Sequence, residues 1–376
     1  MKLGILKEPD FENRVSLLPE GVEILIKKKV EIIIEKGAGT KAFARDEEYS
    51  DAGAAVVSRS EVVRDSEIIL IINPPVDLQN LGLQEGQVFL SVINPFMNKE
   101  VVKFLQKQGV TTFSMDLVPR ITRAQAMDIL SSMATIAGYK AVLDAAMALP
   151  KFFPMFMSAA GTIKPAKILI LGAGVAGLQA IAIARKLGAV VEVFDVRSAV
   201  KEEVKSLGGK FIEVEGAVED AAAGGYAVEQ TDEFKNKQAR AIHDHAIASD
   251  VVICTAQIPG KKAPVLLKKS TVEQMKQGAV IIDLAASTGG NCELTEDDKE
   301  IMTNGIRIIG KSDYPSDMPS DASKMFGRNL INFLSLIIDE EGNLDLNFED
   351  EIVQGTCLTH NKEIIHSRVK EFLNQQ

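Results

Sequence analysis

The sequence has no tryptophan, only three cysteines and four histidines, and few aromatic residues. Cys254, Cys292 and Cys357 are far apart and match no metal-ligand spacing, so we expect reduced thiols and no metal site. No histidine precedes His243, which leaves most of the chain without this common acid–base group. These scarcities argue against a disulfide scaffold and against a metal centre.

Positive charge and long apolar runs are also scarce. The formal net charge is −10, and no basic stretch could offset nucleic-acid phosphates, so we expect no nucleic-acid partner. No segment of about 18 uninterrupted apolar residues occurs, because glycines, Gln179 and Arg185 break the most hydrophobic stretch. The apolar run at the N-terminus is too short for a signal peptide. We therefore expect a cytoplasmic chain without a membrane span of its own.

What the sequence does contain is one strong motif within residues 168–197. A β-branched run stops at Gly172, the spacing Gly172, Gly174, Gly177 opens an alanine-rich helical segment, and a second apolar strand then ends in Asp195. The glycines permit a tight turn, a close backbone approach to a pyrophosphate and close helix–strand packing, while the helix N-terminus offers free N–H groups. Because strand, glycines, helix, strand and acid occur in order, we favour a dinucleotide site over a turn without a ligand.

Asp195 predicts a preference for NAD(H) over NADP(H). Its carboxylate can accept hydrogen bonds from the adenosine-ribose hydroxyls, and it would repel a 2′-phosphate. Arg197 is a counter-signal, since an arginine at this place can welcome that phosphate. We expect Arg197 to turn away along the following helix, which leaves the choice to Asp195.

Elsewhere the chain alternates short apolar runs with helical periodicity. This alternation predicts an α/β protein with two doubly wound, Rossmann-like parallel sheets, the second in the strand order 3-2-1-4-5-6. In the first half we expect strands over 3–6, 31–34, 54–57, 68–72, 88–92 and 111–113, with helices over 19–28 and 99–107. In the second half we expect strands over 168–171, 190–194, 211–214, 251–254, 279–284 and 306–309.

The length of the chain exceeds what one hydrophobic core usually organises. We expect a discontinuous first α/β domain of residues 1–135 plus 320–376. Residues 136–319 would form the Rossmann NAD(H)-binding domain, with an interdomain cleft for the ligand.

Two helices are expected to link these domains. A helix over 122–149 would begin with a capping box of Thr122 and Gln125 and lead into the second domain. A helix over 322–338 would return to the first domain, and its apolar stripe would consist of Leu330, Phe333, Leu334 and Ile337.

A polar stripe accompanies the start of the first of these helices. A solvated face with a cap is the plainer interpretation. Against it, the segment is rich in alanine and methionine, has no Glu–Lys pairs, and lies where two domains should meet. The stripe consists of Gln125, Asp128, Ser131, Ser132, Thr135 and Tyr139, with Arg120 as the cation beside it.

Two glycine-containing loops each allow two interpretations. Gly224 and Gly225 beside Tyr226 could form a hinged lid over a ligand, or an ordinary surface loop. Residues 289–292, the GGNC loop, follow a strand and could form a cleft wall or a simple turn.

Acid–base groups for a free-standing dehydrogenase are few. Such an enzyme needs a proton donor or acceptor near the reacting carbon. Lys7 and Arg14 could bind a carboxylate, whereas His243 and His245 lie in a polar helical segment where we expect solvation.

Several stretches closely resemble the soluble NAD(H)-binding subunit of proton-translocating NAD(P) transhydrogenase, and the resemblance covers essentially the whole chain. They are PRITRAQAMDILSSMATIAGYKAV (119–142), FDVRSAVKEEVKSLGGKFIEVE (194–215), AGGYA and DLAASTGGNCELTE. That family is related to alanine dehydrogenase, whose ENRV pattern is also present here. Alanine dehydrogenases handle their substrate with a lysine and a histidine in the first domain. The corresponding positions here look like Asn73 and Asn94, which disfavours amino-acid chemistry.

The resemblance implies a homodimer that binds NAD(H) and passes hydride directly to NADP⁺ on a separate NADP(H)-binding subunit. Membrane-embedded subunits would couple this transfer to proton translocation, so the chain would be peripheral on the cytoplasmic, inner face of the cell membrane. Since transfer between two nicotinamides removes no substrate proton, a general base is unnecessary. The end at Gln376 without membrane helices suggests the split-subunit form.

The resemblance also assigns residues. Arg120, Gln125 and Asp128 would be the catalytic residues around the nicotinamide, and Tyr226 would belong to a mobile loop. The alternatives are an alanine dehydrogenase-like NAD-dependent enzyme and a non-catalytic NAD-binding module. The expected NAD(H) contacts are Arg120, Gln125, Asp128, Ser131, Gly172, Gly174, Val175, Ala176, Gly177, Asp195, Val196, Arg197, Tyr226 and Gln257.

Overall fold

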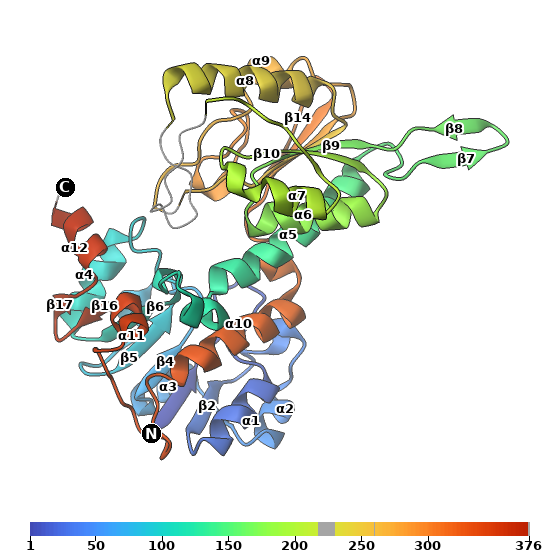
Figure 1. Cartoon of the computed structure of the whole chain (residues 1–376). Helices are drawn as coiled ribbons and strands as arrows, with labels where there is room; N and C mark the ends of the chain where they lie inside the picture. The colour runs from blue at the N-terminus through green and yellow to red at the C-terminus, as the bar shows by residue number, and fades with distance from the viewer. Residues whose placement is uncertain (217–229, 259, 375–376) are drawn as a thin grey trace. The chain divides into compact units, whose positions relative to one another are not determined.

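The computed structural model describes residues 1–216, 230–258 and 260–374 (Figure 1). It contains two compact units: unit 1 comprises Met1–Met133 with Pro315–Gln376, and unit 2 comprises Ala134–Tyr314. The domain limits expected from the sequence, after residues 135 and 319, stay predictions. Within the described ranges, no helix is both long and apolar enough to cross a membrane.

Unit 1 is built on an eight-stranded sheet in the order β17-β16-β6-β5-β4-β1-β2-β3. Its six expected strands are present and pair in parallel. The antiparallel strands β16 and β17 extend the edge beside β6 and were not expected from the sequence. The strands are β1 (Lys2–Ile5), β2 (Glu31–Glu35), β3 (Ala55–Val57), β4 (Ile68–Leu70), β5 (Val88–Ser91), β6 (Thr111–Ser114), β16 (Cys357–His360) and β17 (Glu363–Ile364).

Helices cover both faces of this sheet. One hydrophobic cluster joins the sheet to α1, α10 and α11, and a second joins its other face to α3, α4 and α12. The helices are α1 (Pro19–Lys27), α2 (Asp46–Asp51), α3 (Arg59–Asp65), α4 (Lys99–Gln108), α10 (Pro319–Leu334), α11 (Glu351–Thr356) and α12 (Ser367–Asn374).

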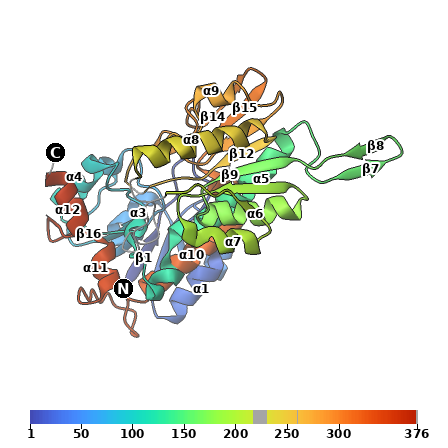
Figure 2. The same ribbon diagram turned by 45° about the horizontal axis from the view of Figure 1, so that its top comes forward.

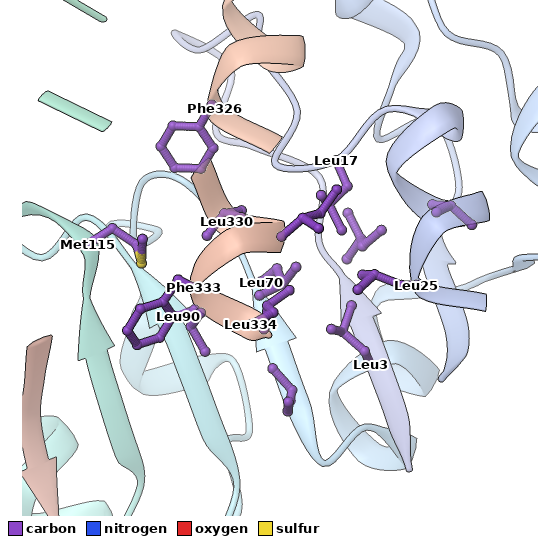
Figure 3. Close-up of a cluster of buried hydrophobic side chains, with 14 of the residues drawn as sticks. Leu3, Leu17, Leu25, Leu70, Leu90, Met115, Phe326, Leu330, Phe333 and Leu334 are labelled. Atoms are coloured by element: carbon purple, nitrogen blue, oxygen red, sulfur yellow. The ribbon is translucent and has the colours of Figure 1, made fainter. Parts of the chain in front are cut away.

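Helix α10 forms the centre of the unit 1 core. Figure 3 shows Leu330, Phe333 and Leu334 beside Leu70 and Leu90 of the sheet, and all five side chains are buried. The expected apolar stripe is therefore confirmed. Burial of each such side chain contributes about 1.5–3 kcal/mol, so α10 is firmly anchored.

The single helix expected over 122–149 is wrong at its start. The chain forms a 3₁₀ turn, η4 (Thr122–Met127), and the α-helix α5 (Ile129–Ala148) begins only after Asp128. No side chain caps η4. Instead, the Asp128 carboxylate accepts a hydrogen bond of 2.9 Å from the Ser131 backbone N–H. Aspartate is a strong N-cap residue, so Asp128 rather than Thr122 marks the helix start.

Unit 2 contains a seven-stranded sheet in the order β11-β10-β9-β12-β13-β15-β14. The first six strands confirm the expected order 3-2-1-4-5-6, and the antiparallel edge strand β14 was not expected. The strands are β9 (Lys167–Leu171), β10 (Val190–Phe194), β11 (Lys210–Phe211), β12 (Val251–Cys254), β13 (Val280–Asp283), β14 (Lys299–Thr303) and β15 (Ile306–Gly310).

Alternating side chains of β9 show that both faces of this sheet are covered. Ile168 and Ile170 lie in a cluster with α5, α6 and α7, whereas Leu169 and Leu171 lie in a cluster with α8 and α9. The expected fold of two doubly wound α/β sheets is therefore confirmed. The helices are α6 (Val175–Lys186), α7 (Lys201–Ser206), α8 (Asp232–Ile247) and α9 (Lys269–Val272).

A β-hairpin projects from unit 2 and was also not expected (Figures 1 and 2). Its strands, β7 (Phe156–Ser158) and β8 (Gly161–Ile163), pair only with each other and are exposed along their whole length. The remaining short 3₁₀ turns are η1 (Thr40–Ala42), η2 (Leu78–Asn80), η3 (Met115–Leu117), η5 (Ser198–Val200), η7 (Ala286–Thr288) and η8 (Tyr314–Asp317).

Candidate dinucleotide site

The turn between β9 and α6 has three glycines, and each is required or permitted for a different reason. Gly172 has φ +105°, and a β-carbon there would lie 2.6 Å from Thr255 Oγ1. A β-carbon on Gly177 would lie 2.0 Å from the Gly172 carbonyl oxygen, so helix and strand approach as closely as backbone allows. A β-carbon on Gly174 would meet no atom within 4 Å. The backbone at Gly174 is thus open to a ligand.

The N-terminus of α6 is available to an anion. Gly174 is the N-cap residue, it provides no side-chain cap, and both Gly174 and Val175 are exposed. The first N–H groups of a helix have no partner within the helix, and they carry a partial positive charge. The half-buried Ala176 packs against α5, where a β-carbon on Gly138 would lie 2.1 Å from its carbonyl oxygen. This turn fits the pyrophosphate of a dinucleotide.

Asp195 follows β10, and its carboxylate joins the glycine turn to Arg197. Oδ2 accepts a 2.7 Å hydrogen bond from the Ala173 N–H. Arg197 Nε donates to Oδ1 at 2.9 Å, and its terminal nitrogen donates to Oδ2 at 2.7 Å. The expectation that Arg197 turns away is therefore wrong, because the paired carboxylate holds it. The half-buried Val196 lies between the two, and the pKa of Arg197 is raised by its hydrogen bonds to Asp195.

Gln257 follows β12 and is exposed, and its side-chain amide donates to the Leu284 carbonyl oxygen at 2.8 Å. Nearby, Asn291 of the GGNC loop binds the Ala256 backbone twice, at 3.0 Å to the N–H and 2.8 Å to the carbonyl. These amide contacts join the chain after β12 to the chain after β13. They fix the wall of the site beside the glycine turn.

A buried carboxylate that the sequence analysis missed organises the GGNC loop. Asp283 Oδ2 accepts hydrogen bonds from the N–H groups of Asn291 and Cys292 and from the Thr295 hydroxyl, at 2.7 to 2.9 Å. A β-carbon on Gly290 would lie 2.9 Å from the same oxygen. Burial raises the pKa of Asp283, and these hydrogen bonds counteract part of the rise. Its position at the end of an otherwise apolar strand was the available signal.

The expected nicotinamide residues lie in unit 1, around η4. Arg120 and Gln125 are exposed, whereas Asp128 and Ser131 are half-buried. Ser131 Oγ donates to Asp128 Oδ2 at 2.6 Å, so the Asp128 carboxylate both caps α5 and binds the serine hydroxyl. The glycine turn lies in unit 2. That the two groups contact one nucleotide stays a prediction, as do the roles of the individual residues.

The other residues of the polar stripe, Ser132, Thr135 and Tyr139, are half-buried on α5. Gly224, Gly225 and Tyr226 lie outside the described residues, so the lid stays a prediction. Among the residues that the structure describes, no group of three or more His, Cys, Asp or Glu side chains could hold a metal ion.

In unit 1 the ends of β1 and β4 are joined by carboxylates, which the sequence analysis did not single out. Glu8 accepts hydrogen bonds from the N–H groups of Ile72 and Asn73, at 2.6 and 3.0 Å. Burial raises the pKa of Glu8 to about 8. Glu12 accepts from the Asn73 amide at 2.8 Å and forms a two-pronged pair with Arg14. Arg14 is thus already paired with a carboxylate of its own chain.

The neighbouring Asn94 is exposed, with φ +49°. Asn73 and Asn94 therefore present amides at the two positions where the resemblance to alanine dehydrogenase would require a lysine and a histidine. Lys7 contributes its backbone to this region: its N–H donates to Glu35, and its carbonyl accepts from Arg59.

Comparisons with known proteins agree with this arrangement of two units. The "Alanine dehydrogenase/PNT, N-terminal domain" family model matches residues 4–137, and the "Alanine dehydrogenase/PNT, C-terminal domain" model matches residues 141–367. The chain therefore belongs to the alanine dehydrogenase/PNT family.

Within this family the chain is similar to transhydrogenase subunits. It is 44% identical to the first of the separate chains that form NAD(P) transhydrogenase subunit alpha of Rhodospirillum rubrum, over 97% of this chain and 98% of that protein. The crystal structure of transhydrogenase from Sinorhizobium meliloti is 40% identical, covers 97% of this chain and 100% of its own, and superposes with a TM-score of 0.88. An L-alanine dehydrogenase structure shares the fold at 23% identity, with a TM-score of 0.83 and coverage of 100% of this chain and 99% of its own.

The identities to transhydrogenase subunits support an oxidoreductase role as a transhydrogenase subunit. The relatives imply that the chain binds a nicotinamide nucleotide, and their designation as subunit alpha implies partner subunits.

Proposed function

We propose that this chain is the NAD(H)-binding subunit of a proton-translocating transhydrogenase, and that it exchanges hydride directly with NADP(H) on a partner subunit. Membrane-embedded partners would couple the exchange to proton translocation and hold the chain at the inner face of the cell membrane. The observation that carries the proposal is the open glycine turn before the uncapped α6, in a chain 44% identical to a transhydrogenase subunit over nearly its full length.

The residues have separate tasks in this proposal. The first N–H groups of α6 would bind the pyrophosphate, and Asp195 would bind the adenosine ribose. Arg120, Gln125 and Asp128 would orient the nicotinamide, which supplies or accepts the hydride. No side chain need remove a proton from the substrate, because hydride passes between two nicotinamide rings. This agrees with amides at Asn73 and Asn94, where a dehydrogenase of this family would need acid–base groups.

A homodimer is part of the proposal. The β7–β8 hairpin supports it, because a two-stranded hairpin without further packing is marginally stable in water. The hairpin and its flank expose large apolar side chains: Met155 is 61% exposed, Met157 71% and Phe152 50%. Sedimentation of the purified chain, compared with a Met157→Lys variant, tests whether this surface joins two copies.

The test of function is reconstitution. The purified chain is mixed with its membrane and NADP(H)-binding subunits, and hydride transfer from NADH to an NADP⁺ analogue is followed by absorbance. We expect transfer only when all subunits are present. In parallel, the chain alone is given pyruvate, ammonia and NADH. Oxidation of NADH in that second assay would favour an alanine dehydrogenase, and binding of NADH without transfer in either assay would favour a non-catalytic module.

A further inference from the structure

The turn η4 is held in place by amide side chains from α10. Asn329 Nδ2 donates to the Ala126 carbonyl oxygen at 2.8 Å, and Asn332 Nδ2 donates to the same oxygen at 2.9 Å. The two asparagines stand three residues apart, so they lie on the same face of α10. A carbonyl oxygen has two lone pairs, and this one directs both to a single helix.

The support for these amides is rigid. On the adjoining face of α10, Leu330 and Phe333 are buried in the unit 1 core. A second brace holds the same turn, because Arg123 donates to both carboxylate oxygens of Asp350, at 2.6 and 2.9 Å. The Arg123 side chain is 48% exposed, so solvent weakens this ion pair, and the amides of α10 are the better-shielded support.

Asn329 is not the residue that stability alone would favour at its position. It is 6% exposed, and its Oδ1 is buried without a hydrogen-bond partner among the residues that the structure describes. A buried acceptor without a donor costs free energy, and an apolar side chain of the same size would avoid that cost. The bond to Ala126 is therefore what the amide provides.

We propose that Asn329 and Asn332 are positioning residues, which hold the Ala126 peptide so that Gln125 and Asp128 keep the orientation needed for hydride transfer. Ala126 follows Gln125 directly, and the Asp128 N–H closes the turn onto the Gln125 carbonyl at 3.3 Å. A rotation of the Ala126 peptide would therefore redirect both side chains. The inference rests on the proposed function, in which these two side chains surround the nicotinamide.

The test compares Asn329→Leu, Asn332→Ala and the double variant in the reconstituted complex. Because the two amides share one acceptor, each can partly replace the other. Each single change should slow hydride transfer severalfold, and the double change should slow it by about 10²-fold, more than the product of the single effects. KM for NADH should change less than kcat.

Ser335→Ala is the matched control. Ser335 Oγ donates to the Ile331 carbonyl at 2.8 Å on the same helix, away from η4. We expect the control to transfer hydride at the normal rate, and the double variant to unfold at a temperature close to that of the control. Should leucine disturb the core, the Asn329→Ala/Asn332→Ala variant replaces the first double variant.

A double variant with the normal rate, or one whose rate loss is matched by an equal loss of NADH affinity, overturns the proposal. If the wild-type complex transfers no hydride, the proposed function fails, and amide hydrogen exchange over residues 122–128 then decides on the clamp. NADH-dependent protection that is lost only in the double variant supports positioning by the two asparagines. Protection that is absent from the wild type, or unchanged in the double variant, overturns it.

Discussion

The two sheets of this protein have the same strand order, but the ends of their first strands are built in opposite ways. In unit 1, β3-β2-β1-β4-β5-β6 repeats the order β11-β10-β9-β12-β13-β15 of unit 2. Between the ends of β1 and β4, the Glu8 carboxylate fills the space and binds two backbone N–H groups. Between the ends of β9 and β12, Gly172 leaves room for the Thr255 side chain and the chain turns directly into α6.

This difference shows that the doubly wound topology supplies only the place for a nucleotide. Both units have strand ends at a topological switch point, where ligands bind in open α/β sheets. A buried side chain occupies that place in unit 1, whereas glycine leaves it open to backbone and ligand in unit 2. Substitutions on each side can therefore break or sharpen the comparison.

The largest expected effect comes from closing the glycine turn. In Gly177→Ala the new methyl group would lie 2.0 Å from the Gly172 carbonyl oxygen, so helix and strand must separate. We expect a loss of about 1–3 kcal/mol in the free energy of unfolding and loss of measurable NADH binding. Gly174→Ala is the control, because its methyl group meets no protein atom. It should keep the melting temperature while weakening NADH binding, as measured by fluorescence titration. Normal NADH binding by Gly177→Ala would contradict the assignment of the turn.

The next effect concerns the unit 1 residues around η4. Arg120→Ala, Gln125→Asn and Asp128→Asn should each slow hydride transfer more than they weaken NADH binding, because the pyrophosphate and adenosine are held by unit 2. Asparagine caps helices about as well as aspartate, so Asp128→Asn should leave the melting temperature nearly unchanged. Single-turnover rates are compared with dissociation constants. Equal losses in rate and affinity would assign these residues to binding alone.

Glu8 gives unit 1 a pH dependence that the glycine turn of unit 2 does not have. Because burial raises the Glu8 pKa from 4.5 to about 8, the folded state binds a proton that the unfolded state releases. Stability should therefore fall as the pH rises from about 4.5 to 8, by at most about 1.4 kcal/mol per pH unit, and then level off. Glu8→Gln should remove this part of the slope in urea unfolding at pH 6 and pH 8.5. A slope identical to that of the wild type would contradict a buried, protonated Glu8.

The smallest effect concerns the choice of nucleotide. Wild-type chain should bind NADH more tightly than NADPH, because Asp195 repels a 2′-phosphate. Arg197→Gln removes the cation paired with Asp195 and should increase this preference severalfold in paired titrations. Asp195→Asn should reduce it. Equal affinities of the wild-type chain for NADH and NADPH would refute the role of Asp195.

Long parallel strands and the glycine motif were predictable from the sequence because local pattern determines them. Buried strands such as β9 and β13 are continuous apolar runs, and only glycine tolerates the turn at Gly172. The antiparallel additions β14 and β16 were missed because their pairing is a tertiary choice: β14 alternates weakly, and β16 pairs with β6 although all of unit 2 separates them in the sequence.

Side-chain partners were less predictable than strands. The Thr122–Gln125 spacing fits a capping box, yet Asp128 three residues later is the stronger cap and determines where α5 begins. Arg197 has a helix ahead of it, but a carboxylate two residues away offers a two-pronged pair. Spacing alone does not reveal which of two competing partners binds.

The discontinuity of unit 1 has a consequence for the order in which the chain acquires its structure. The Thr359 hydroxyl binds the Val110 carbonyl across 249 residues, and α10 supplies the centre of the same core. During synthesis, residues 1–133 emerge first but lack α10 and β16, whereas every strand of unit 2 is already present when Tyr314 leaves the ribosome. Long-range pairing is slow because loop closure must precede its reward. Unit 2 thus folds from an uninterrupted segment, while the exposed β6 edge and the incomplete core of unit 1 wait for the segment from Pro315 onward.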